Sequence, residues 1–294
     1  MNEDVAGQMY SHMRAGADKP RVAIQGGEGS FHEIIARQTL GENIEIVPCA
    51  TFRELAVRVE SGKADVAVMA IENSIAGSIL ANYNILQRGT LKIVGEAYLH
   101  IRQHLMANPG VKLEDIQEVH SHPMALQQCA DYLDQHRWKL VEEDDTALSA
   151  KHLAETRATN AAAIASSAAA KLYGMEIIAP DIHTIKNNHT RFLILAPSDS
   201  DIVAHGADKA SIYFKTNHEQ GSLFRVLKAM ENTDMNMSKL QSYPIPSEPW
   251  RYMFHVDMEF GNVESFIRTL DAMRAEAQEI QVYGIYRKGL DHSA

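Results

Sequence analysis

The last third of the chain carries the pattern that most restricts its fold. From Arg251 to Phe260, large apolar side chains recur at every second position, which is the period of a β-strand. Amphipathic helices are predicted before and after it, from Leu223, Val226, Leu227 and Met230 and from Val263, Phe266, Ile267, Leu270 and Met273. With further strands at 210–215, 235–240 and 280–286, the order is βαββαβ. This order predicts a ferredoxin-like unit.

The first two-thirds instead alternates short apolar runs with helical patterns. Strands are predicted at 22–25, 66–71, 93–98, 104–107, 119–121, 140–142, 161–164 and 192–196. Capping-box spacings predict helices that begin at Phe31 and Phe52. Other helices are predicted at 123–135, 147–155 and 166–173, and a polar linker at 198–208. This alternation is typical of open α/β sheets, either one or two of them.

Composition excludes several classes of protein. A formal net charge of −10 argues against a nucleic-acid surface and against docking on anionic lipid. No apolar run approaches the ~18–20 residues of a membrane span. The two cysteines, Cys49 and Cys129, fit no metal spacing, and with no export signal they suggest the reducing cytoplasm. Residues 1–20 are predicted to be a disordered leader.

Polar clusters follow several predicted strands, where ligands bind in open α/β sheets. GGEG at 26–29 with Ser30 is explained by a tight turn and a helix cap, which we favour over nucleotide binding. Glu72-Asn73-Ser74 fits a helix cap and a set of strand-tip donors equally well. Ser121-His122-Pro123 also reads as a cap, and His122 alone is a weak catalytic signal.

A third polar run leads into the strand at 192–196. Asn187 to Arg191 are five consecutive hydrogen-bonding side chains, which are costly to place against a core without a purpose. No Ser-His-Asp, HExxH, CxxC or Walker pattern is present. The remaining donors are mostly uncharged, with one arginine. Such a site would bind a small polar anion, or assist a reaction that needs little chemical help.

Three of these clusters together resemble one family. IENSIAGS (71–78), SHPMALQQC (121–129) and NHTRF (188–192) are similar, in this order, to the three signatures of prephenate dehydratases. GSLFRVL (221–227) resembles the glycine-led ligand loop of their regulatory ACT domain. The resemblance covers residues ~21–289, nearly the whole chain.

The resemblance implies a fold and its boundaries. Family members have two α/β lobes like a type 2 periplasmic binding protein, with the active site between the lobes. It implies a catalytic domain at 21–198, with lobe one at 21–100 and 190–197 and lobe two at 101–185. An ACT domain is implied at 208–289, and TRF would then lie on the crossover between the lobes.

The implied reaction converts prephenate to phenylpyruvate with loss of carbon dioxide and water. Thr190 would protonate the leaving hydroxyl and Arg191 would pair with a substrate carboxylate, beside the catalytic residues Asn73 and Ser74. The remaining residues implied at the site are Ser30, Glu72, Ser121, Gln128 and Phe192, with Glu72 orienting its neighbours and Phe192 packing. No metal or organic cofactor is needed.

Departures from the family pattern affect mainly the regulatory part. Ala70 stands for the usual proline, and the first loop lacks a histidine at the expected place. The ACT motif ESRP reads Gln241-Ser242-Tyr243-Pro244. We still expect L-phenylalanine to bind in a homodimer or homotetramer, between those residues of one subunit and the Asn217–Leu223 loop of the other. That loop contributes Asn217, Gly221, Ser222 and Leu223.

Two alternatives stay open. Arogenate dehydratase performs the same chemistry on an amino-acid substrate, and the motifs do not separate the two activities. A non-catalytic amino-acid sensor with a binding-protein fold is the other alternative. The Thr190-Arg191 pair favours an enzyme, because a sensor needs no hydroxyl at a leaving group. The expected location is the cytoplasm, with no nucleic-acid or membrane partner.

Overall fold

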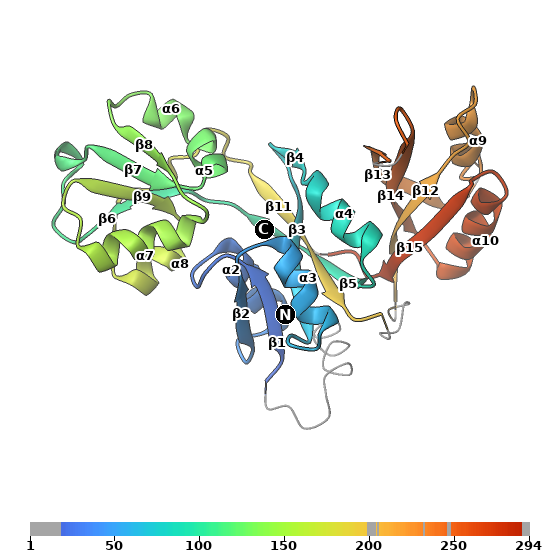
Figure 1. The fold of residues 1–294 in the computed structure, drawn as a ribbon, viewed down its shortest axis with the longest axis horizontal. Coiled ribbons are helices and arrows are strands. Elements are labelled where there is room, and N and C mark those ends of the chain that lie inside the picture. The colour runs from blue at the N-terminus through green and yellow to red at the C-terminus, as the bar shows by residue number, and fades with distance from the viewer. Residues whose placement is uncertain (1–18, 199–203, 205, 232, 246–247, 290–294) are drawn as a thin grey trace.

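The computed structural model describes residues 19–198, 204, 206–231, 233–245 and 248–289 of the 294-residue chain. Residues 1–18 of the predicted leader and residues 199–203 and 205 of the predicted linker lie outside the described residues. Three sheets, each with its own helices, lie in a row (Figure 1). The first lies in the middle, between the second sheet and the C-terminal sheet.

The first sheet has the order β2-β1-β3-β11-β5, with the short β4 paired to β3. Its strands are β1 (Arg21–Gln25), β2 (Glu45–Cys49), β3 (Val66–Asn73), β4 (Gly77–Ser78), β5 (Lys92–His100) and β11 (His189–Ala196). Helices α2 (Phe31–Leu40), α3 (Phe52–Glu60) and α4 (Leu80–Arg88) belong to this lobe. β11 returns from the second lobe and inserts antiparallel between β3 and β5. This strand therefore places a late segment of the chain at the centre of lobe one.

The second sheet has the order β10-β6-β9-β7-β8. Its strands are β6 (His104–Ala107), β7 (Glu118–Ser121), β8 (Lys139–Glu142), β9 (Ala161–Ala165) and β10 (Glu176–Ala179). Its helices are η1 (Leu113–Asp115), α5 (Pro123–Gln128), α6 (Ala130–Leu133), α7 (Thr146–Thr156) and α8 (Ser167–Tyr173). Two mixed α/β sheets linked by β5 and β11 confirm the predicted two-lobed α/β fold class.

The C-terminal sheet has the order β13-β14-β12-β15. Its elements are β12 (Lys209–Lys215), α9 (Ser222–Lys228), β13 (Met235–Pro244), β14 (Tyr252–Phe260), α10 (Val263–Arg274) and β15 (Glu279–Tyr286). The predicted βαββαβ order is confirmed. Both faces of β14 are buried: Val256 and Met258 belong to the core of this domain, whereas His255 and Asp257 face lobe one.

Several predicted boundaries were wrong for local reasons. The helix predicted at 123–135 is interrupted at Cys129, and the strands predicted at 66–71 and 192–196 extend to Asn73 and back to His189. The strands β2, β4 and β10 and the helix α4 were not predicted. β2 is an edge strand that contains a proline, and the N-cap residue of α4, Ile79, makes no side-chain cap bond. No helix within the described ranges is long and apolar enough to cross a membrane.

Candidate active site

A cleft of about 370 Å³ lies between the two lobes of the first two sheets. Lobe one contributes the first turn of α2 and the cleft-side ends of β3 and β11, and lobe two contributes the N-termini of α5 and α7. Five residues predicted at the site line it: Ser30, Asn73, Gln128, Thr190 and Phe192. The structure therefore brings together residues that are as many as 162 positions apart in the sequence, because 192 minus 30 is 162.

Asn73 and Thr190 face each other across the β3–β11 pair. They are register partners, and Asn73 Nδ2 donates to Thr190 Oγ1 at 3.0 Å. The orientation of the Asn73 amide is fixed because its Oδ1 accepts the backbone N–H groups of Ile75 and Ala76, at 3.0 and 2.9 Å. Nδ2 must therefore point toward β11, where it also lies 2.7 Å from Asn188 Oδ1.

This arrangement makes the Thr190 hydroxyl a donor toward the cleft. Its oxygen accepts a hydrogen bond from Asn73 Nδ2, so the hydroxyl hydrogen is left to point at another acceptor. A hydrogen bond to the oxygen also favours the state in which the hydroxyl has lost its proton. A side chain that is 9 % exposed at the wall of a cavity can therefore protonate a bound leaving group.

Other cleft residues supply hydrogen bonds or shape. Ser30 caps α2, because its Oγ accepts from Glu33 N at 3.3 Å, as predicted. Gln103 Nε2 donates to Gln128 Oε1 at 3.3 Å, and the buried Gln103 Oε1 has no hydrogen-bond partner within the described part of the chain. Phe192 is 1 % exposed and packs edge-on against His32, in agreement with a packing role.

His122 lines the cleft and is better placed to contact a substrate than its weak sequence signal suggested. It is the N-cap of α5, and its Nδ1 accepts from Met124 N at 3.1 Å. In the neutral ring the proton therefore lies on Nε2, which makes Nε2 a donor. Because His122 lines the cleft, this donor is available to a substrate anion.

The electrostatics of the cleft are unusual for a site that binds anions. None of the described residues that line it is a lysine or an arginine, whereas Asp144 and Asp145 do line it. Burial raises the pKa of the Asp145 carboxyl, although backbone N–H groups of Leu148, Ala147 and Gly27 oppose the shift. Burial lowers the pKa of His32 to about 4, so this ring is neutral at pH 7.

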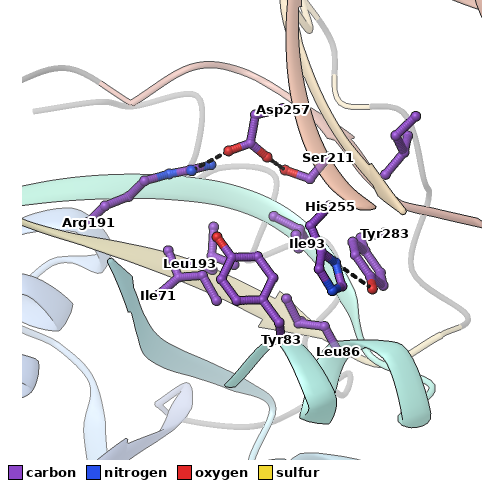
Figure 2. A pocket seen from close by; sticks show the side chains of 11 residues that line it. Ile71, Tyr83, Leu86, Ile93, Arg191, Leu193, Ser211, His255, Asp257 and Tyr283 are labelled. Carbon is purple, nitrogen blue, oxygen red and sulfur yellow. Dashed lines mark hydrogen bonds and ion pairs between the residues drawn. The ribbon is translucent and has the colours of Figure 1, made fainter. Parts of the chain in front are cut away.

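The structure contradicts the predicted role of Arg191. Its side chain is 6 % exposed and points toward Asp257 of the C-terminal domain (Figure 2). Arg191 Nε donates to Glu96 Oε2 at 2.7 Å, and Nη1 pairs with Asp257. Successive side chains of a strand point to opposite faces, so Thr190 and Arg191 cannot both line the cleft.

Three further predicted residues do not line the cleft. Glu72 pairs with Lys239 of β13, at 2.5 Å between Oε1 and Nζ. Ser74 is exposed, and its Oγ accepts from His189 N at 2.9 Å, which joins β11 to the β3–β4 turn. Ser121 is fully buried and donates to Ile164 O at 2.7 Å. Ser74 and Ser121 thus hold backbone segments in place, and neither is positioned to contact a substrate in the cleft.

Residues predicted for an effector lie at one end of the C-terminal sheet. Lys215 at the end of β12 and Tyr243 on β13 both pair with Met253, so the Asn217–Leu223 loop and the Gln241–Pro244 strand end lie one strand apart. Tyr243, however, points to lobe one, where its hydroxyl bonds Asn84 of α4. The Tyr243 side chain therefore contacts lobe one, a partner that its predicted role in effector binding did not include.

Sequence reasoning missed several cleft residues, above all Gln103, Asp144 and Asp145. Asp145 is the N-cap of α7 and accepts from Leu148 N at 2.8 Å. Its position just before an apolar helical pattern was a usable signal. Gln103 follows the crossover from lobe one and belongs to no regular element, so periodicity gives no signal for it.

Comparisons with known proteins show the family to which the chain belongs. Residues 22–200 match the family described as Prephenate dehydratase. The chain belongs to the prephenate dehydratase family. It is 40 % identical over 278 residues to "Arogenate dehydratase/prephenate dehydratase 2, chloroplastic" of Arabidopsis thaliana, a match that covers 90 % of this chain and 72 % of the relative. As a member of this family, the chain is a dehydratase, an enzyme of the lyase class.

Two solved structures share the fold. One is a prephenate dehydratase from Arthrobacter aurescens in complex with L-Phe, with a TM-score of 0.82, 28 % identity and coverage of 91 % of this chain and 90 % of that chain. The other is GqqA, described as a novel type of quorum quenching acylase, with a TM-score of 0.81, 29 % identity and coverage of 91 % and 98 %. Both matches extend over nearly all of the two lobes and the C-terminal domain.

Proposed function

We propose that this dehydratase converts prephenate to phenylpyruvate with Thr190 as the proton donor. The observation that carries the proposal is the hydrogen bond from Asn73 Nδ2 to Thr190 Oγ1 at the wall of the cleft between the lobes. It directs the hydroxyl proton toward the cavity and stabilises the oxygen that loses it. The reaction requires one donor at the leaving hydroxyl, and this pair provides it.

The reaction balances with a single proton. The bond between the ring and its carboxylate breaks and releases carbon dioxide, and its electron pair enters the ring. The bond between the ring and its hydroxyl breaks at the same time, and the departing oxygen takes the Thr190 proton to leave as water. A proton from solvent then restores the hydroxyl of Thr190. Because aromatisation drives the step, a weak neutral acid that is held in place is sufficient.

Uncharged donors would hold the two substrate carboxylates. His122 Nε2 donates from the N-terminus of α5, and Ser30 lies at the N-terminus of α2, whose partial positive charge favours an anion. Gln103 Oε1, which has no hydrogen-bond partner among the described residues, is an acceptor suited to a substrate hydroxyl or ammonium. This division of donors and acceptors favours binding of the substrate's anionic groups toward α2 and α5.

Substitution of Thr190 tests the proposal. Thr190→Ala is expected to lower kcat by ~10²–10⁴, the usual range for a positioned proton donor, with a smaller change in KM. Thr190→Ser should keep much of the activity because it retains the hydroxyl. Steady-state assays of phenylpyruvate formation measure both variants. Normal turnover by the alanine variant would show that Thr190 is not the donor.

Arogenate is the alternative substrate. The name of the Arabidopsis relative supports this alternative, because it includes both activities. Arogenate carries an ammonium group, and the cleft offers Asp144 and Gln103 Oε1 as acceptors for one. Parallel measurement of kcat/KM for prephenate and arogenate decides which substrate is preferred. Thr190 would serve the same leaving hydroxyl in both.

We further propose that the C-terminal domain is an ACT domain that binds L-phenylalanine and inhibits the enzyme, as part of a homodimer or homotetramer. The Arthrobacter relative was solved with L-Phe. Gly221 precedes α9 with a φ of +77°, which L side chains rarely adopt, so the loop geometry depends on glycine. The backbone N–H groups of such a loop can bind an amino-acid carboxylate.

Calorimetry with phenylalanine on the full chain tests this proposal. Gly221→Val is expected to abolish the heat of binding and leave phenylalanine-free turnover near the parent value. Gly110→Val is the matched control, because Gly110 has a similar φ of +85° but lies in lobe two. A parent chain that gives no heat, or a Gly221→Val chain that binds normally, would rule out this site.

A further inference from the structure

The two strands that carry the proton donor also carry the contacts to the C-terminal domain. Thr190 pairs with Asn73, and the next residues along the two strands, Arg191 and Glu72, pair with each other. Because side chains alternate between the faces of a sheet, the first pair faces the cleft and the second faces away. Each residue of the 190–73 pair is thus covalently joined to a residue that faces the C-terminal domain.

Arg191 is bound firmly on that far side. Its guanidinium pairs with Asp257 of β14 and donates from Nη2 to the Tyr286 hydroxyl of β15 at 3.1 Å. Asp257 in turn accepts from Ser211 Oγ of β12 at 2.5 Å (Figure 2). Three of the four C-terminal strands therefore contribute to the hold on one β11 side chain.

The charges in this contact balance. Glu96 accepts from Arg191 and also from Lys209 Nζ, which lies 3.0 Å from each of its carboxylate oxygens. Arg191, Asp257, Glu96 and Lys209 are each 6 % exposed or less, and they form two cations with two anions. Removal of one member of a buried ion pair leaves an uncompensated charge, so this arrangement strongly resists displacement.

Glu72 is held by the fourth strand. Lys239 Nζ of β13 lies 2.5 Å from Glu72 Oε1 and donates to Ser78 Oγ of β4 at 2.8 Å. One lysine thus binds both strands of the β3–β4 hairpin. The turn of this hairpin also provides the N–H groups of Ile75 and Ala76 that orient the Asn73 amide. The Lys239–Glu72 contact therefore lies one residue from Asn73, whose amide hydrogen-bonds the Thr190 hydroxyl.

We propose that Arg191 and Glu72 are positioning residues, through which the C-terminal domain fixes the location of the Thr190–Asn73 pair in the cleft. The proposal rests on the proposed role of Thr190 as the donor. A proton donor acts only within about 2.6–3.2 Å of its acceptor, and a displacement of ~1 Å can lower a rate ~100-fold. Any movement of the C-terminal sheet relative to lobe one would be transmitted to the donor over a single peptide unit.

The pair formed by Lys239 and Glu72 gives the cleaner test, because the Glu72 side chain is 34 % exposed and substitution there leaves no fully buried charge. In the full chain, Lys239→Met is expected to lower kcat about 10-fold with KM within twofold of the parent. Lys239→Arg keeps the charge and should retain most of the activity. The exchange Glu72→Lys with Lys239→Glu restores an ion pair and should recover most of the loss.

A matched control uses the same interface away from the donor. Lys92 Nζ donates to Val282 O of β15 at 3.4 Å, but Lys92 pairs with Ala196, six positions along β11 from Thr190. Lys92→Met should leave kcat unchanged. If Lys239→Met also leaves kcat unchanged, the positioning role is wrong. It is also wrong if the exchanged pair recovers no activity although Lys239→Met and the exchanged variant both unfold near the parent temperature.

Thr190→Ala, assayed in parallel, separates the two proposals. An inactive Thr190→Ala chain beside a fully active Lys239→Met chain overturns the positioning role and leaves the donor intact. An active Thr190→Ala chain overturns the donor assignment itself. Asp257→Asn is a second probe of the buried side, and its unfolding temperature shows whether a lower kcat reflects loss of fold.

Discussion

Asn73 Nδ2 donates a hydrogen bond to Thr190 Oγ1 at 3.0 Å between partner positions of β3 and β11. Two backbone N–H groups fix the Asn73 amide, so its orientation follows from the turn that β3 enters. β11 is paired with β3 on one side and β5 on the other, and a donor on such a strand is better supported for catalysis than one on a loop would be.

Asn73→Asp tests this relationship with almost no change of shape. The aspartate oxygen in place of Nδ2 would accept a hydrogen bond from the Thr190 hydroxyl and turn its hydrogen away from the substrate, and the aspartate charge would oppose loss of that proton. We expect kcat to fall by ~10²–10³, as for removal of one donor from an oxyanion site. Steady-state kinetics measure the change. KM should rise as well, since the cleft would gain a negative charge.

Asn108→Asp is the control for this substitution. Asn108 Nδ2 donates to the carbonyls of Leu153 and Ala158, at 2.8 and 2.9 Å, in lobe two and outside the cleft lining. The change should lower the unfolding temperature without lowering kcat of the folded enzyme. Equal losses of kcat in both variants would mean that the effect of Asn73→Asp comes from stability.

Local sequence patterns predicted most of the strands and helices, because each of these carries its own period. The cap residues Ser30 and Thr51 start their helices as predicted, since their hydroxyls accept N–H groups three residues on. The alternation from Arg251 to Phe260 also identified β14. Caps and strand alternation depend only on residues that are close together in the sequence, so they can be predicted from it.

Which residues cover the second face of a strand depends on tertiary packing, and for β11 the sequence pattern led to a wrong prediction. The run from Asn187 to Arg191 was interpreted as one polar surface, but β11 already begins at His189 and divides the run between two faces. Had the strand been extended to His189, alternation alone would have separated Thr190 from Arg191. That the C-terminal domain covers the far face has no local signal.

Tyr243 shows the same limit for the regulatory part. In QSYP it replaces the arginine of the family motif, and the structure places its hydroxyl against Asn84 of α4. On β13 the residues Lys239 and Tyr243 share the face toward lobe one, while Leu240 is 39 % exposed. The tyrosine therefore adds a contact between the domains. A comparison of motifs alone would show only the loss of an effector-binding arginine.

Gly284 should be essential to the docking of β15 on lobe one. A Cβ atom at this position would lie 1.9 Å from Ile93 O of β5, far inside van der Waals contact with a backbone atom. Gly284→Ala is expected to destabilise the chain by about 1–3 kcal/mol or more, because the strands must separate. Urea denaturation measures the loss. Gly261→Ala, where a Cβ would meet no atom of the described residues within 4 Å, is the control. Equal stability of the two variants would contradict this role.

His255 should make the interface between the domains sensitive to acid. It is 3 % exposed, its Nδ1 lies 3.1 Å from the Tyr283 hydroxyl, and burial lowers its pKa to about 4. The unfolded chain, with a histidine pKa near 6.5, binds this proton first, so stability is complete above about pH 6.5 and is lost as pH falls toward 4. The loss from this ring is about 3 kcal/mol, because the pKa values differ by about 2.5 units at 1.36 kcal/mol each.

The double variant His255→Phe with Tyr283→Phe isolates that effect, since it removes both partners of the hydrogen bond and leaves neither unpaired. Its free energy of unfolding should fall less steeply between pH 6.5 and 4 than that of the parent. The remaining slope should include His32, whose pKa burial also lowers to about 4. The exposed His152, changed to Phe, is the control and should leave the parent slope intact. Urea titrations at half-unit pH steps measure the slopes, and identical slopes for parent and double variant would exclude His255 as the acid-sensitive group.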